Sequence, residues 1–135
     1  MATLAQLRAG LATRLATIAS LKGIYEDAPG QVETPGAVIR MGSPAITYAT
    51  STISHDYTFS ILLLHSLADA GTAQENLDGY LDTSGADSVL AAVEADPDLG
   101  GACDAAMVTS VANAGPVTWH GVEYLGAEFL VTVLA

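Results

Sequence analysis

Residues 57–64 constrain the fold most, because alternate residues of this segment form one face that is apolar throughout and a second face that is apolar only at its far end. The odd-numbered residues of the segment are all apolar, as on one face of a β-strand: Tyr57, Phe59, Ile61 and Leu63. The even-numbered residues change from polar to apolar along the chain: Thr58, Ser60, Leu62 and Leu64. The second face is therefore apolar at its far end, which predicts a central strand covered on both sides there.

The first third of the chain predicts a helix followed by two short strands. Apolar residues recur at steps of three and four in the helix, which Thr3 opens as the N-cap: Leu4, Leu7, Leu11, Leu15 and Ile18. A short strand begins at Ile24, and a second one is expected at residues 37–41. The loop between them, residues 27–36, holds two Pro-Gly steps. Residues 43–55 are polar and lightly apolar, which predicts a long connection or an extended arm.

The remainder of the chain predicts two short helices and a return to β-structure. Capping boxes at residues 72–75 and 84–87 indicate where the two helices begin. A turn at residues 96–101 precedes strands at 105–113, 117–119 and 122–134, the last with one apolar face. With the segments 105–113 and 117–119 counted as one broken strand, the order is roughly αβββααββ, in a single domain over residues 1–135. It predicts an α+β fold, with a mixed or antiparallel sheet and helices packed mainly on one face.

The charges of the chain are distributed unevenly along it. The permanent cations all precede residue 41: Arg8, Arg14, Lys22 and Arg40. Twelve of the 15 carboxylates follow that point, and the formal net charge is −11. A surface built from residues 41–135 would not hold phosphates, because nucleic-acid binding depends on neutralising backbone charge. A high-GC or high-salt host also depletes lysine, and composition alone does not separate the two explanations.

Cysteine use and hydropathy indicate a cytoplasm, or a particle assembled in one. The single cysteine, Cys103, excludes an internal disulfide and fits a reducing compartment. No apolar run approaches the roughly 20 residues that span a bilayer. Polar residues interrupt the N-terminal apolar stripe, so we do not expect a signal peptide or a membrane partner.

Residues that could carry chemistry are few. His65 and Asp69 are four residues apart, but a base with an orienting carboxylate would still need a nucleophile. The histidines show no metal-ligand spacing, and we expect no catalytic, cofactor-binding or metal site. One alternative is a small enzyme or ligand-binding domain that uses His65, Asp69 and His120. Another is a cytoplasmic, dimeric binding module.

A set of segments in a fixed order resembles a phage protein family. The N-terminal helix reads MATLAQLRAGLATRLATI, and the central strand of the type DYTFSILLL precedes AQENLDGYLD. These are followed by SGADSVLAAVEADPDLGG and by the ending GPVTWHGVEYLGAEFLVTVLA. Together the segments, which cover nearly the whole chain, resemble the tail-terminator or head–tail connector (neck) proteins of phages with long, non-contractile tails.

The resemblance implies a structural role in the virion and no enzymatic activity. Such terminators are α+β subunits that form a hexameric ring on the tail tube, stop its growth and meet the head–tail connector or stopper protein. DNA would pass through the ring without specific binding. Assembly would occur in the host cytoplasm, with the protein ending in the tail or neck. Another neck or minor tail protein of the same particle is an alternative.

Two groups of residues are expected to matter in such a ring. Subunit contacts are predicted at sheet edges and the first helix, through Arg8, Arg14, Arg40, Ile46, Tyr48 and Ile53. At least one of the three arginines is expected to pair across a subunit boundary with an acid from residues 69–98. Acids of the two short helices and the following turn are predicted to line the DNA channel: Glu75, Asp78, Asp82, Asp87, Glu94, Asp96 and Asp98.

Overall fold

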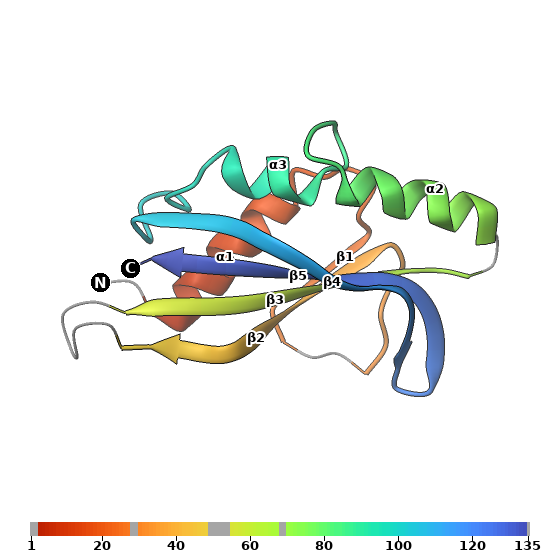
Figure 1. Cartoon of the computed structure of the whole chain (residues 1–135), viewed down its shortest axis with the longest axis horizontal. Coiled ribbons are helices and arrows are strands. Elements are labelled where there is room, and N and C mark those ends of the chain that lie inside the picture. The colour runs from red at the N-terminus through yellow and green to blue at the C-terminus, as the bar shows by residue number, and fades with distance from the viewer. Residues whose placement is uncertain (1–2, 28–29, 49–54, 68–69, 135) are drawn as a thin grey trace.

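The computed structural model describes residues 3–27, 30–48, 55–67 and 70–134 of the chain. Within these ranges the elements follow the predicted order αβββααββ (Figure 1). The helices are α1 (Leu4–Leu15), α2 (Ala70–Leu81) and α3 (Val89–Glu94). The strands are β1 (Gly23–Tyr25), β2 (Gly36–Thr47), β3 (Asp56–His65), β4 (Ala105–Trp119) and β5 (Val122–Leu134). The predicted α+β fold is confirmed.

The described strands form one mixed sheet in the order β1-β2-β3-β5-β4. β1 pairs with β2 in parallel, and all the other neighbours pair antiparallel. β3 lies at the centre and pairs with β5 along its whole length, from Asp56 opposite Leu134 to His65 opposite Leu125. Leu62 and Leu64 are buried on its second face. The prediction of a central strand covered on both sides at its far end is therefore confirmed.

The three described helices pack on the sheet face that carries the odd-numbered residues of β3 and β5. Each helix buries its apolar side there: Leu7, Leu11 and Leu15 of α1, Ala73, Leu77 and Tyr80 of α2, and Val89 and Val93 of α3. α1 ends at Leu15, earlier than the leucine stripe predicts, although Ile18 remains in the core. Full burial of one such side chain stabilises the fold by about 1.5–3 kcal/mol. This layer is therefore the main source of stability.

The opposite face of the sheet, here called the second face, is covered at one end. Val38, Leu62 and Leu64 form a small buried cluster there. It is packed by side chains of the β1–β2 region and of the outer part of the β4–β5 hairpin: Tyr25, Val32, Val117, Trp119 and Tyr124. Figure 1 shows this hairpin curving away from the helices α2 and α3 at its far end. The curvature brings the hairpin over the cluster.

The curvature of the hairpin follows from breaks in its ladder. The β4–β5 register shifts between Val108 and Ser110 and again between Ala112 and Gly115, and such bulges bend and twist a strand. Gly115 has φ 145°, which only glycine adopts readily. It pairs with Gly126, where a Cβ would collide with the carbonyl oxygen of Leu63. Glycine at 126 therefore allows β5 to lie this close to β3.

Three helix N-caps were predicted, and one is confirmed. Thr3 accepts a hydrogen bond from the Gln6 backbone N–H and returns one to its side chain, so the cap of α1 is correct. The box at residues 72–75 is wrong, because α2 begins two residues earlier, at Ala70. The box at residues 84–87 is also wrong, because Ser88 caps α3. Its buried hydroxyl accepts from the Ala91 N–H and donates to the Asp82 carbonyl, so both hydrogen-bonding roles are satisfied.

The arm predicted at residues 43–55 is wrong in its first part, which belongs to β2. Ile46 pairs with Tyr57 and Thr47 with Asp56. Between Met41 and Ile46 the register shifts, so that residues 42–45 face one residue of β3. The Gly-Ser-Pro sequence therefore interrupts the ladder without ending the strand. Residues 49–54 lie outside the described part of the chain.

Candidate functional site

The acids predicted to line a channel all belong to the helical side of the molecule. Five are exposed: Glu75, Asp78, Asp82, Glu94 and Asp98. They lie on α2, on α3 and in the segments that follow these helices. The fold thus collects them in one layer, on the side of the sheet that carries the main core. Whether this layer faces DNA stays a prediction.

Asp87 differs from these five acids, because it is half-buried and bonded within the fold. It accepts a hydrogen bond of 2.8 Å from the Ser20 hydroxyl, whose oxygen lies 2.9 Å from the Tyr80 hydroxyl. Burial raises the pKa of Tyr80 above its ordinary value, and the bond to Ser20 offsets part of this increase. Asp87 therefore helps to tie the segment after α1 to α2.

The carboxyl groups of Asp96 and Asp98 interact in the turn after α3. The pKa of Asp96 is raised, mainly by its side-chain hydrogen bond with Asp98. The same bond is the main reason that the pKa of Asp98 is lowered. Backbone N–H groups of Gly100 and Gly101 also favour the charged form of Asp98. The two carboxyl groups thus interact with each other, and that of Asp98 also interacts with the backbone of the turn.

The three arginines predicted at subunit contacts each have a partner in their own chain. Arg8 lies 4.0 Å from the carboxylate of Asp27, whose side chain is 96% exposed. Arg14 donates from Nε to the carbonyl of Ala92 at 3.0 Å, which joins α1 to the last turn of α3. All three arginines are half-buried. Pairing of any of them with a neighbouring subunit stays a prediction.

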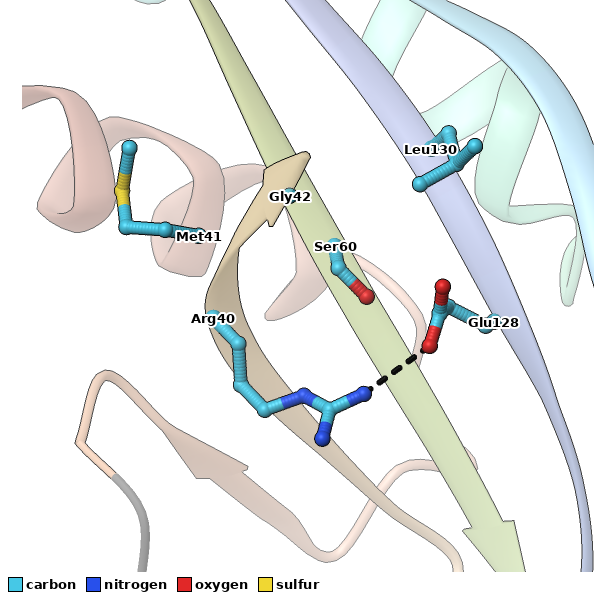
Figure 2. A pocket seen from close by; sticks show the side chains of 6 residues that line it. All are labelled: Arg40, Met41, Gly42, Ser60, Glu128 and Leu130. Atoms are coloured by element: carbon cyan, nitrogen blue, oxygen red, sulfur yellow. Dashed lines mark hydrogen bonds and ion pairs between the residues drawn. The ribbon is translucent and has the colours of Figure 1, made fainter. Parts of the chain in front are cut away.

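Arg40 makes the shortest described ion pair, and the partner is not an acid of residues 69–98. Its Nη2 lies 2.9 Å from Oε2 of Glu128. Its guanidinium carbon also lies 5.9 Å from the ring centroid of Trp119, within cation–π range. Figure 2 shows Arg40 on β2 and Glu128 on β5 reaching toward each other across β3, where Ser60 lies between them. The pair thus crosses the sheet on its second face.

A shallow pocket of about 340 Å³ surrounds this pair; it is lined by Arg40, Met41, Gly42, Ser60, Glu128 and Leu130 (Figure 2). Nε of Arg40 and Oγ of Ser60 are buried there without a hydrogen-bond partner among the described residues. Glu128 already balances the charge of Arg40. The pocket is therefore better suited to an uncharged hydrogen-bonding group, such as a backbone carbonyl, than to a free anion.

The three predicted arm anchors have different outcomes. Ile46 is half-buried and packs against the main core, and its contact with a neighbouring subunit stays a prediction. Tyr48 is 64% exposed, and its ring meets that of His55 edge to face at 5.0 Å. Ile53 lies outside the described residues. Tyr48 is thus the anchor that stays open to a partner.

The residues of the alternative enzyme site have different neighbours. His65, at the end of β3, lies 2.9 Å from the Ser66 carbonyl through Nδ1 and 3.1 Å from the Asn76 amide through Nε2. Both of its ring nitrogens are therefore occupied. His120 lies in the β4–β5 turn with its ring against Trp119. Asp69 lies outside the described part of the chain.

Cys103 is a half-buried thiol beside the acidic turn. Burial raises its pKa, and the carboxylates of Asp98 and Asp104 raise it further. The thiol therefore stays protonated at neutral pH.

Sequence reasoning missed the partnership of Arg40 with Glu128 and Trp119. One signal was present: Glu128 is even-numbered in a strand whose odd-numbered residues form the apolar face. That parity places Glu128 on the second face of the sheet. Its partner could be identified only from the strand order, because the two residues are 88 positions apart.

Among the described residues, no cluster of three or more His, Cys, Asp or Glu side chains could hold a metal ion. The described helices are all too short or too polar to cross a membrane. No protein-family model matches the chain, and no curated protein sequence matches it.

Proposed function

We propose that this chain is a structural virion protein that forms a ring of six copies on the tail tube of a long-tailed, non-contractile phage. The ring caps the tube, joins it to the head–tail connector or stopper protein, and leaves a channel for DNA. The ordered segments that resemble tail terminators support this proposal. The α+β fold in the order αβββααββ is compatible with it.

The observation that carries the proposal is the position of the exposed acids in the fold. Five of them lie together on the helical layer, whereas the described cations nearest to that layer are paired within the chain: Arg8 with Asp27 and Arg14 with Ala92. A channel lined by such a layer repels phosphates and releases no counterions when DNA enters. DNA would therefore pass without being held. In this arrangement α2, α3 and the turn after them face the channel, and the sheet edges and α1 face neighbouring subunits.

Native mass spectrometry of the purified full chain tests the ring directly. We expect a single closed species of six copies, either alone or after addition of the tail tube protein. A chain that stays monomeric with the tube protein present, and that binds a metal ion or a metabolite, would contradict the proposal. It would favour the alternative of a small enzyme or ligand-binding domain.

Charge reversal tests the orientation of the acidic layer. Changing Asp78, Asp82 and Glu94 together to Lys is expected to leave tails intact and to slow DNA ejection, because the new cations bind phosphates. Added salt should restore the ejection rate by screening that attraction. The matched control changes Glu26, Asp27 and Glu33, three exposed acids of the β1–β2 region, to Lys. Equal ejection rates for the two triple variants would exclude the channel position.

A further inference from the structure

We propose that copies of this chain join edge to edge, with β4 of one copy pairing antiparallel with β2 of the next. The sheet would then continue from one subunit into its neighbour. This inference rests on the proposed ring and specifies how the ring is held together. The occupant of each open edge is therefore a second copy of this chain.

Both edges of the sheet have a stretch without a strand partner among the described residues. β4 is the outermost strand on one side. The backbone N–H of Ala106 donates to the carbonyl of Pro97, so the open stretch begins at about Met107. On the other side β1 covers β2 only as far as Val38. Residues 41–47 of β2 are therefore open as well.

The two open edges are also free of charge. The three longest stretches without Asp, Glu, Lys or Arg are residues 41–55, 57–68 and 105–122. The stretch at 57–68 contains the central strand, which is uncharged because it is buried. The other two contain the open parts of β2 and β4. Edge strands of soluble proteins usually carry charges that prevent association, and this chain has a formal net charge of −11. Its copies can therefore approach with least repulsion at these two edges.

Apolar side chains are exposed at the same two places. Met107 is 37% and Val111 is 41% exposed on β4. Tyr48, at 64% exposed, directly follows β2. Val111 lies opposite Phe129, on the helical face, and Met107 lies opposite Thr132, on the second face. Pairing of the two edges would therefore cover apolar surface on both faces, which adds to the main-chain hydrogen bonds.

The strand directions allow this contact to repeat around a ring. β2, β3, β5 and β4 pair antiparallel in turn, so β2 and β4 run in opposite directions. A neighbour related by rotation about a ring axis would thus present its β2 antiparallel to β4. Such a contact joins two different surfaces, and it closes into a ring if the rotation is right. Pairing of β4 with β4 would instead stop at a dimer.

Other features of β4 limit the length of the contact. Pro116 has no N–H to donate, and the ladder shifts between Ala112 and Gly115. Pairing is therefore confined to residues 107–112, and the bulge between Val108 and Ser110 lies inside this stretch. On β2, residues 42–45 form a bulge and Pro44 has no N–H to donate, so the regular open residues are Met41, Ile46 and Thr47. The contact is therefore short, and charge does not block it.

Disulfide trapping tests the pairing in the full chain carrying Cys103→Ser. One population carries Met107→Cys or Val111→Cys on β4, and the other carries Ala45→Cys or Thr47→Cys on β2. Within one copy these strands are three strand spacings apart, about 14 Å. A disulfide needs Cα atoms within about 7 Å. Any disulfide between β2 and β4 must therefore join two copies.

We expect at least one mixture of the two populations to form disulfide-linked dimers at least tenfold faster than either population alone. Val111→Lys is added to the chain that carries Met107→Cys, and this double variant is mixed with a chain that carries a β2 cysteine. We expect linked dimers to form at least tenfold more slowly than without Val111→Lys. Val122→Lys is the matched control, because Val122 is 51% exposed at the hairpin end and outside the proposed contact. It should leave assembly unchanged.

Other results would overturn the pairing. These are a β4 cysteine that links to itself as fast as in the mixture, or rings that assemble without any link between β2 and β4. In the second case the proposed ring would be supported and the edge pairing would be wrong. Linked dimers or filaments without a closed ring would support the edge pairing and contradict the proposed ring.

Discussion

Replacing Glu128 by glutamine is expected to lower the free energy of unfolding by about 1 kcal/mol. The substitution keeps the size of the side chain and removes the charge that Arg40 faces at 2.9 Å. The side chains of the pair are 37% and 24% exposed. Fully exposed pairs contribute roughly 0–1 kcal/mol, whereas removing one partner of a fully buried pair costs about 3–5 kcal/mol. This pair lies between those limits and nearer the exposed one.

Arg40→Met should cost more than Glu128→Gln, about 2 kcal/mol. It removes the same ion pair and also the contact of the guanidinium with Trp119, which contributes about 0.5–1 kcal/mol in comparable sites. The double variant should lose less than the sum of the two single variants. A coupling free energy of about 1 kcal/mol is the expected value for the pair.

Urea unfolding of the four proteins at one fixed protein concentration measures these quantities. We expect the midpoint to shift without a change in the slope m. In a thermal scan, 1 kcal/mol corresponds to about 3–5 °C for a domain of this size. A coupling below about 0.3 kcal/mol would refute the argument, because the pair would then be no stronger than a solvated one.

Asp27→Asn is the matched control for Glu128→Gln. Asp27 lies 4.0 Å from Arg8, and its side chain is 96% exposed. Solvent screens such a pair, so its loss should change the free energy of unfolding by less than about 0.5 kcal/mol. If both variants lost the same free energy of unfolding, the partial burial of the Arg40–Glu128 pair on the second face would add nothing to its strength.

Two further substitutions test the local structure. Gly126→Ala should lower the free energy of unfolding by about 2–3 kcal/mol, because its Cβ would collide with a backbone carbonyl of β3. The control, Gly79→Ala in α2, should raise it by about 0.5–1 kcal/mol, since a Cβ has room there. Equal effects in urea unfolding would contradict the close approach of β5 to β3. Ser88→Ala should cost about 1–2 kcal/mol, because it removes both the N-cap bond of α3 and the donor to Asp82. Ser84→Ala should be neutral in the same assay, and a larger loss there than at position 88 would restore the cap predicted from the sequence.

The parts of the fold that follow from strand periodicity could be predicted from the sequence. The change from Ser60 to Leu62 on one face of β3 correctly indicated cover on both sides of its far end. The odd-numbered residues of β5 were correctly assigned to one buried face. In both strands the buried face requires an apolar residue at every second position, so the alternation of apolar residues in the sequence identifies the residues that face the core.

Features that depend on tertiary contacts could not be predicted. The end of β2 was missed because its ladder resumes at Ile46 after the bulge, through pairing with Tyr57. Ser84 and Ser88 both fit the local pattern of an N-cap. Ser88 is the cap because the carbonyl of Asp82 accepts its hydroxyl. The partners of Arg14 and Arg40 are 78 and 88 positions away, so neither bond is visible without the arrangement of the elements.

The separation of charge in this fold determines how salt should act on the proposed ring. Each copy carries a formal net charge of −11, so closing a ring brings like charges together. Salt screens that repulsion over about 10 Å at 0.1 M. Contacts between the uncharged edges of β2 and β4 depend on main-chain hydrogen bonds and apolar burial, which screening does not weaken. Pairs between an arginine and a neighbour's acid would be weakened by salt instead. The bonds of Arg14 and Arg40 within their own chain favour the first case, in which salt strengthens the ring.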